Sequence, residues 1–141
     1  MNLPEAERLR RAGRRVTRPR LAVYRALREL GGHRSADDIG EHLGAQGQRL
    51  PRASVYNSLE VLREAGLVMM ADVGPGRTLY EAADAWHHHF VCRHCGVVVD
   101  IACVRGMKPC LEAELPGTFI DEAQVIFRGA CATCATGVER A

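Results

Sequence analysis

Two Cys-x-x-Cys pairs are the most specific chemical feature of this 141-residue chain. They read Cys92-Arg-His-Cys95 and Cys131-Ala-Thr-Cys134. Each pair can chelate an ion from a tight turn, and four thiolates complete a tetrahedral zinc shell with no open position. A redox Cys-x-x-Cys normally begins a helix in a thioredoxin-like βαβ unit, and the sequence around the pairs lacks that pattern. We therefore expect a structural Zn²⁺ on all four cysteines, and its binding would stabilise the C-terminal part of the chain.

Three consecutive histidines stand just before the first cysteine pair. If residues 86–92 form a strand, the side chains alternate between its two faces, so His87 and His89 share one face. His88 then lies on the opposite face together with Cys92. The pair formed by His87 and His89 is therefore a two-imidazole chelate that is separate from the zinc and needs ligands of its own.

Three further residues near structural junctions are candidate ligands for that second ion. Glu81 ends a predicted hairpin, His33 lies in a Gly-Gly-His turn, and Asp100 interrupts the apolar run VVVDI. An unpaired carboxylate inside an apolar strand would be costly. Three imidazoles and two carboxylates suit Fe(II) or Mn(II), allow Co, Ni or Zn, and disfavour Cu(I). Any one of these residues alone is more often structural than ligating, so the prediction depends on the set.

The elements that must position these residues are indicated by helix caps and hydrophobic periodicity. We expect a short polar helix over residues 5–13 and a second helix that begins at Thr17 and stops at a Gly-Gly pair. Ser35 and Asp38 form a capping box for a third helix, and a fourth is expected over residues 51–65. The segments LVMMADV and RTLYEA flank Gly-Pro-Gly, which indicates a hairpin. Three helices and a hairpin are the order of a winged helix-turn-helix, whose last helix enters the DNA major groove.

The predicted fourth helix has one apolar and one polar face. Val55, Leu59 and Leu62 recur at helical spacing and should face a core. The opposite face has side chains that hydrogen-bond or stack, and we expect them to contact bases or phosphates. These residues are Arg52, Ser54, Tyr56 and Asn57. The alternative interpretation is a generic small α+β domain whose polar helix face meets only water.

Charge is distributed unevenly along the chain, whose net charge is only +2. Residues 1–82 contain 14 Arg against 10 acidic residues, and residues 83–141 contain 5 basic and 7 acidic residues. Seven of the arginines lie within positions 8–20, which is the electrostatic pattern of a surface that faces phosphates. The members of this cluster that we expect to contact phosphate are Arg14, Arg15, Arg18 and Arg20.

A change of composition at Ala82-Ala83 predicts two domains within an α+β fold. Residues 1–82 would form the winged-helix DNA-binding domain. Residues 83–141 would form a small α/β dimerisation and metal-binding domain with a zinc knuckle. Its predicted strands are HHFVC, VVVDIAC and TFIDEAQVIFRGAC, and the helical stretch KPCLEAEL separates the last two. Strands in so small a lobe leave open edges, with which a second copy could pair.

Several classes of protein do not fit the sequence. No apolar run approaches the length of a membrane span, and the charged start MNLPEAERLRRAGRR does not resemble a signal peptide, so we expect a cytoplasmic protein. A zinc hydrolase or deaminase needs an open zinc position, and the H-x-E signature of deaminases is missing. A thiol oxidoreductase is disfavoured by the missing βαβ context. We therefore expect a regulator rather than an enzyme.

These segments together resemble the ferric uptake regulator (Fur) family. The matching pieces are RVTRPRLAVYRAL, HRSADDI, RASVYNSLEVLREAGLV, LYE, HHHFVCRHCG and the closing CATC. The family consists of homodimeric, metal-dependent winged-helix repressors, so the resemblance implies a homodimer that binds double-stranded operator DNA. It also implies the structural zinc on the four cysteines and a regulatory Fe²⁺ or Mn²⁺. This second ion would bind ligands from both domains, across the hinge between them, and would set the angle between the two domains. The regulatory ligands implied are His33, Glu81, His87, His89 and Asp100.

Asp100 and its surroundings resemble one branch of that family. An aspartate at this position resembles the peroxide-sensing (PerR) branch, whereas iron-sensing relatives tend to have glutamate. The run CGVVVDIACVRGMKPCLEAEL is similar to actinobacterial FurA and CatR members. The implied mechanism is reduction of hydrogen peroxide by Fe(II), oxidation of His33 or His87, loss of the metal and release of the operator. Mn(II) would not support this chemistry. The alternative is a repressor that senses the level of iron, manganese, zinc or nickel itself.

Two features depart from the family pattern or lie outside its motifs. Asp121-Glu122-Ala123 occupies the region where some relatives have a histidine of a further metal site, so we do not expect a third site at His88. Cys103 and Cys110 lie outside the zinc motif. They could form a thiol switch, but two buried free cysteines are the commoner outcome in a small lobe.

Overall fold

The computed structural model describes residues 3–83, 87–102, 115–120, 123 and 125–136. The chain divides into two compact units, Met1–Asp84 and Ala85–Ala141, each of which is described by itself. The predicted boundary after residue 82 and the roles assigned to the two domains stay predictions.

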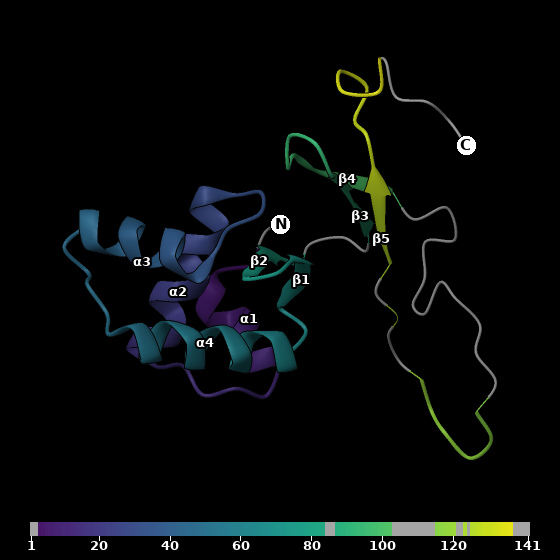
Figure 1. Ribbon diagram of the computed structural model, residues 1–141. Coiled ribbons are helices and arrows are strands. Elements are labelled where there is room, and N and C mark those ends of the chain that lie inside the picture. Colours follow the sequence, from purple (N-terminus) through teal and green to yellow (C-terminus); the bar gives the residue numbers. More distant parts are fainter. Residues whose placement is uncertain (1–2, 84–86, 103–114, 121–122, 124, 137–141) are drawn as a thin grey trace. The chain divides into compact units, whose positions relative to one another are not determined.

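The N-terminal unit contains four helices followed by a two-stranded antiparallel sheet (Figure 1). Its elements are α1 (Glu5–Arg11), α2 (Arg18–Leu30), α3 (Ala36–Ala45), α4 (Arg52–Glu64), β1 (Val68–Gly74) and β2 (Arg77–Ala82). The predicted caps are confirmed. Thr17 accepts a hydrogen bond from the backbone N–H of Arg20 at 3.3 Å, and Ser35 and Asp38 form a reciprocal capping box at 3.0 Å in each direction. These contacts satisfy N–H groups that the first turn of a helix leaves without helical partners.

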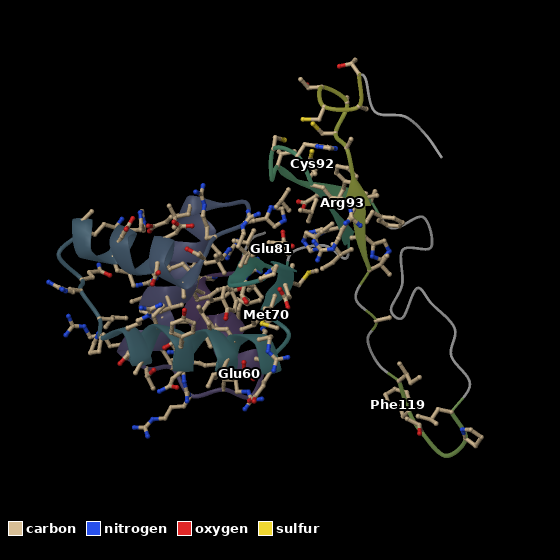
Figure 2. The ribbon with its side chains drawn as sticks, in the orientation of Figure 1. Glu60, Met70, Glu81, Cys92, Arg93 and Phe119 are labelled. Carbon is tan, nitrogen blue, oxygen red and sulfur yellow. The ribbon has the colours of Figure 1, made fainter. Side chains whose placement is uncertain are left out.

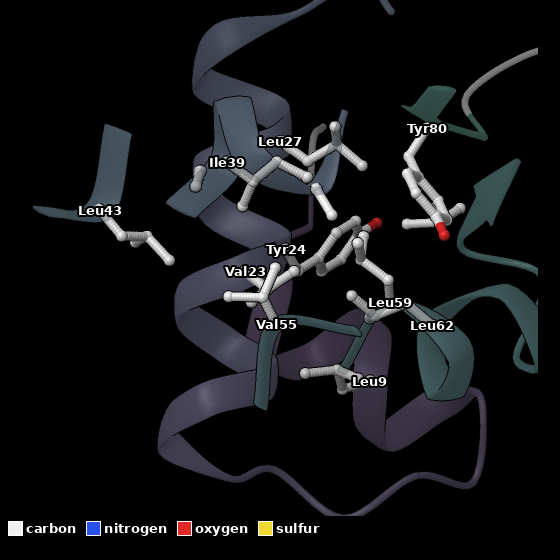
Figure 3. Close-up of a cluster of buried hydrophobic side chains, with 13 residues drawn as sticks. Leu9, Val23, Tyr24, Leu27, Ile39, Leu43, Val55, Leu59, Leu62 and Tyr80 are labelled. Carbon is white, nitrogen blue, oxygen red and sulfur yellow. The ribbon is translucent and has the colours of Figure 1, made fainter. Parts of the chain in front are cut away.

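One hydrophobic core holds the four helices and the hairpin of the N-terminal unit together (Figure 3). Tyr24 and Leu27 of α2 pack with Leu59 and Leu62 of α4, and Tyr80 extends the core to strand β2. The prediction that Val55, Leu59 and Leu62 form the inward face of α4 is confirmed, since all three are buried. Burial of this face leaves the polar face of α4 exposed.

A short backbone bridge joins the turn after α2 to strand β2. Gly31 and Gly32 adopt positive φ angles of 63° and 60°, a conformation that glycine permits, and they reverse the chain at the end of α2. Arg34 N–H then donates to the carbonyl of Tyr80 at 2.9 Å, and Tyr80 N–H donates to the carbonyl of Arg34 at 2.7 Å. This antiparallel bridge places His33 next to Glu81 in register.

The C-terminal unit contains a three-stranded sheet with the order β4-β3-β5 (Figure 1). Its strands are β3 (His87–Cys92), β4 (Val98–Ala102) and β5 (Ile126–Gly129), and β3 pairs antiparallel with β4 and parallel with β5. The last predicted strand is shorter than expected, because residues 118–120 are not in a strand. Thr118 N–H instead donates to the carbonyl of Leu115 at 3.1 Å in a turn. The predicted helical stretch at 108–115 lies largely outside the described residues, as do Cys103 and Cys110.

The predicted α+β fold class is confirmed by this arrangement of four helices, a hairpin and a separate small sheet unit. Within the part of the chain that the structure describes, no helix is both long and apolar enough to span a bilayer.

Candidate functional site

The two cysteine pairs meet at one end of the C-terminal sheet. Cys92 ends strand β3 (Figure 2), and it pairs in register with Gly129, the last residue of β5. Because the two strands run parallel, the turns that follow them leave the sheet at the same end. These turns contain Cys95 and Cys131. The sulfur atoms of Cys95 and Cys131 lie 3.8 Å apart, and all four Sγ atoms lie within 4.8 Å of one another.

This sulfur arrangement fits zinc. A tetrahedral ion with Zn–S distances of about 2.3 Å separates any two sulfurs by about 3.8 Å, which matches the Cys95–Cys131 distance. Gly96 supports the first turn with a positive φ of 76°, and its N–H donates to the carbonyl of Cys92 at 3.0 Å. Cys92 is buried, and none of the four cysteines forms a disulfide. The cysteine cluster is consistent with the predicted zinc knuckle.

The electrostatics of the four thiols favour a bound cation. The backbone N–H groups of Cys95 and Cys131, at 3.5 and 3.4 Å from Cys92 Sγ, lower the pKa of the Cys92 thiol to about 5. A hydrogen bond between the Cys134 thiol and the Cys131 sulfur, followed by desolvation, raises the pKa of Cys134 to about 12, because both favour the protonated thiol. A bound divalent cation would replace the remaining thiol protons, because a thiol that coordinates a metal is deprotonated.

A second donor set lies on one face of the same sheet. His89 and Asp100 are directly opposite each other in the antiparallel register of β3 and β4. Asp100 Oδ1 lies 3.3 Å from His87 Nε2 and 3.8 Å from His89 Nε2, and the two imidazole centroids are 5.0 Å apart. The prediction that His87 and His89 share a face is therefore confirmed. His88 points to the other face, where its ring contacts Phe127 at 6.4 Å between centroids.

These three residues have the composition of a known class of metal site. Two histidines and one carboxylate on one face, with further positions open, are the donor set of mononuclear non-haem Fe(II) sites. Potential ligand atoms of His87, His89 and Asp100 all lie within 4.8 Å of one another. His89 is only 3% exposed, whereas the Asp100 side chain is half exposed. The N/O composition fits the hard-to-intermediate metals that the sequence predicted.

The N-terminal unit provides a separate pair of donors. His33 Nε2 lies 3.4 Å from Glu81 Oε2, and both side chains are largely buried. Glu81 is near the end of strand β2 (Figure 2). Backbone pairing of Arg34 with Tyr80, one residue along in each segment, holds the two donors opposite each other. Burial of a carboxylate is costly, and a metal ion bound beside it would offset part of that cost.

Arg34 is a positioning residue that the sequence did not reveal. Its guanidinium donates to the carbonyl of Gly31 at 3.0 Å and to that of Leu30 at 3.2 Å. It thereby satisfies carbonyls that the last turn of α2 leaves without helical partners, and its charge complements the helix dipole. In the sequence, Arg34 is only a basic residue shortly after the end of a predicted helix. Such residues are too common for this pattern to identify one with a positioning role.

The predicted DNA contacts fall into three groups. Arg20, Ser54 and Asn57 line one cavity of about 200 Å³ between the start of α2 and α4. The predicted phosphate ligands Arg14 and Arg15 lie in the segment between α1 and α2 and Arg18 begins α2. In this region Arg20 Nη1 donates to the carbonyl of Arg15 at 3.0 Å. Arg52 and Tyr56 form a third group, with the Arg52 guanidinium 5.7 Å from the centre of the Tyr56 ring.

A winged-helix unit and a small sheet unit with these donor sets define a metal-dependent transcription regulator. The chain matches the ferric uptake regulator family over residues 11–107. It is 42% identical over 134 residues to transcriptional regulator FurA of Mycobacterium tuberculosis. The aligned region covers 92% of this chain and 88% of that protein. It is 31% identical over 130 residues to the peroxide operon regulator of Bacillus subtilis. Here the aligned region covers 91% of this chain and 89% of that protein.

The solved structures agree with this assignment. The ferric uptake regulator of Pseudomonas aeruginosa, solved with manganese, superposes with a TM-score of 0.73 at 27% identity, over 92% of this chain and 99% of that one. The chain therefore belongs to the ferric uptake regulator family, as its motifs predicted. Members of this family regulate transcription and are not enzymes, so the hydrolase, deaminase and oxidoreductase alternatives are excluded.

Proposed function

We propose that the protein is a homodimeric repressor that binds double-stranded operator DNA when a regulatory Fe²⁺ or Mn²⁺ is bound and releases it after peroxide oxidises a ligand histidine. The observation that supports this most strongly is the two-histidine, one-carboxylate face formed by His87, His89 and Asp100, with His87 Nε2 3.3 Å and His89 Nε2 3.8 Å from Asp100 Oδ1. A site of this composition leaves positions open for additional ligands and for peroxide.

His33 and Glu81 would complete the ligand set of the regulatory ion. The N-terminal unit provides these two donors and the C-terminal unit provides three, so one ion would tie the two units together. Five protein ligands leave one position of an octahedral shell for peroxide. Metal affinity that differs between the DNA-binding arrangement and other arrangements would shift the population toward the former.

The peroxide response would depend on which ion is bound. When bound, Fe(II) supplies the reduction of hydrogen peroxide, and Mn(II) does not. The imidazole of His33 or His87 would take up an oxygen atom, and the oxidised ring is a weaker donor to metal. Loss of that donor would release the ion. The two units would then no longer be held in the DNA-binding arrangement, so the operator would dissociate. The similarity to the peroxide operon regulator of Bacillus subtilis supports this mechanism.

The four cysteines would hold a structural Zn²⁺ that does not take part in sensing. Four thiolates fill the tetrahedral shell, which leaves no position for peroxide or for exchange of ligands. The zinc would join the end of β3 to the end of β5 and so maintain the sheet on which His87 and His89 lie. Its contribution is then to the stability of the C-terminal unit.

Dimerisation would use the C-terminal unit. The apolar side chains of Val97, Val99 and Phe127 are each more than 40% exposed there. Among the described strands, β4 and β5 are the edges of the sheet, and open edges of this kind pair readily with a second copy. A dimer would present two α4 helices to successive major grooves of the operator.

The decisive experiment compares the Fe(II)-loaded and Mn(II)-loaded protein without oxygen. Binding to a labelled operator duplex, selected from a randomised pool, is followed by fluorescence anisotropy before and after hydrogen peroxide is added. We expect the Fe(II) form to release DNA and to gain one oxygen atom in the peptide that contains His33 or His87, as measured by mass spectrometry. Peptides with His42 and His94 are internal controls and should stay unmodified. Equal responses of the two forms would reject the oxidation mechanism and favour the alternative, sensing of the metal level itself.

A further inference from the structure

The start of α4 carries an arginine that two neighbours hold in place. Arg52 is the first residue of the helix, and its Nη2 lies 3.5 Å from Asp37 Oδ1 of α3. The same guanidinium lies over the Tyr56 ring, 5.7 Å from its centre. A hydrogen bond with the Tyr56 side chain, followed by the charge of Asp37, raises the pKa of Arg52 above its usual value, which agrees with a guanidinium that both neighbours contact. Asp37 thus reaches from α3 across to a residue on the exposed face of α4.

Stability does not explain this contact. The Arg52 and Asp37 side chains are 72% and 65% exposed, and an ion pair exposed to this degree contributes little to stability because water screens it. An acidic group on a surface that faces phosphates repels DNA of every sequence equally. A carboxylate in this place therefore lowers non-specific affinity for DNA, and what its contact with Arg52 can add is order in the arginine side chain.

The order of Arg52 matters because an arginine selects bases only in a defined orientation. Its bidentate contact with guanine needs both nitrogens of one fork to face the base edge, whereas its contact with a phosphate tolerates many orientations. An arginine that is held from one side by a carboxylate and stacked on an aromatic ring loses less freedom when it reads a base. Discrimination between sequences also improves when contact with the wrong partner is penalised.

We propose that Asp37 is a specificity-determining positioning residue that holds Arg52 against Tyr56, so that this pair at the start of α4 reads the operator as one unit. This inference rests on the proposed function, in which α4 enters the major groove. Asp37 does not itself contact a base. Its carboxylate directs Arg52 and keeps the guanidinium from settling on the nearest phosphate.

Glu41 offers a matched control for Asp37. It lies four residues further along α3, and it lines the same cavity of about 580 Å³ as Asp37 and Arg52. It is exposed, and no contact with Arg52 is seen among the described residues. The substitutions Asp37→Asn and Glu41→Gln therefore remove the same charge from the same helix face, but only the first removes the ion pair with Arg52.

The experiment measures selectivity rather than affinity. The Mn²⁺-loaded full-length protein is titrated with the selected duplex, with its single base-pair variants and with an unrelated duplex. Both substitutions should raise affinity for the unrelated duplex to a similar degree. Asp37→Asn alone should reduce discrimination at one base-pair position per half-site by about tenfold, within the range of a good bidentate contact. In an Arg52→Ala background, Asp37→Asn should have no further effect on selectivity.

Each outcome decides the question. If Asp37→Asn keeps the selectivity of Glu41→Gln, or still changes selectivity in the Arg52→Ala background, the positioning role is refuted. If the metal-loaded wild type shows no sequence preference at all, the proposed function itself fails, and that result does not depend on any variant. Thermal denaturation of each variant confirms that the fold is intact.

Discussion

The substitution Glu81→Gln separates the role of this carboxylate as a ligand from its role in the fold. Glu81 is 6% exposed, and its Oε2 lies 3.4 Å from His33 Nε2. Glutamine has nearly the same shape without the charge, so it relieves the burial of a carboxylate in the metal-free protein. The free energy of unfolding without metal should therefore stay within about 1 kcal/mol of the wild type or rise above it.

The same substitution should weaken Mn²⁺ binding, because an amide oxygen has no net charge to offer the ion. We expect a loss of at least about 100-fold, the upper end of what even indirect partners of a ligand cost. At a free Mn²⁺ concentration about 100 times the wild-type Kd, the ion stabilises the wild type by about 2.7 kcal/mol and the variant by about 0.4 kcal/mol. At about 4 °C per kcal/mol for a chain of this size, the Mn²⁺-induced rise in Tm falls from about 11 °C to about 2 °C.

Thermal denaturation followed by circular dichroism, with and without Mn²⁺, measures both effects in one protein. Glu64→Gln is the matched control, because Glu64 is an exposed carboxylate at the end of α4 in the same unit. It should keep the full Mn²⁺ shift. If Glu81→Gln also keeps the wild-type shift, Glu81 is not a ligand and the reasoning is refuted. If it loses stability without metal, the carboxylate has a structural role that the ligand argument omits.

Three further predictions test the surroundings of the sites. Cys131→Ser should lower the zinc content of the purified protein, measured by atomic absorption, and unchanged zinc would contradict the four-cysteine site. Leu59→Ala removes a fully buried side chain and should lower the free energy of unfolding in urea by about 2–5 kcal/mol. Hydrogen bonds from His42 and then Gln46 lower the pKa of Glu29 below 4.5. Their small contribution to stability is thus present above the unfolded pKa and is lost as the pH falls through the folded pKa. Glu29→Gln should therefore lower the free energy of unfolding slightly at neutral pH, and this difference from the wild type should disappear as the pH falls through the folded pKa of Glu29.

Features that depend on neighbours in the sequence could be predicted. Strand alternation places His87 and His89 on one face, and this needed no knowledge of the remaining chain. The capping box of Ser35 and Asp38 is likewise a local pattern, and the structure has it as predicted. The inward face of α4 followed from helical periodicity alone.

Features that depend on register or on packing between elements could not be predicted. The pairing of His89 with Asp100 depends on how β4 aligns with β3, and a shift of one residue would turn Asp100 to the other face. The contact of Arg52 with Asp37 depends on how α3 packs on α4, and no sequence pattern around either residue predicts it. Strand β5 shows an error of the opposite kind, because the β-rich composition predicted a strand at residues 118–120, which the structure does not place in the sheet.

The register of these pairings bears on how the proposed regulatory ion would act. Arg34 pairs with Tyr80 and His89 pairs with Asp100, so each unit orders its own donors through backbone hydrogen bonds. An ion would then need to bring two ordered half-sites together rather than fold them, and little of its binding free energy would be lost in ordering side chains. Converting a population from 1:99 to 99:1 requires about 10⁴-fold tighter binding to the favoured arrangement. Donors that are already ordered would make such a difference attainable. Under the proposed mechanism, loss of a single imidazole donor would then be enough to reverse the shift.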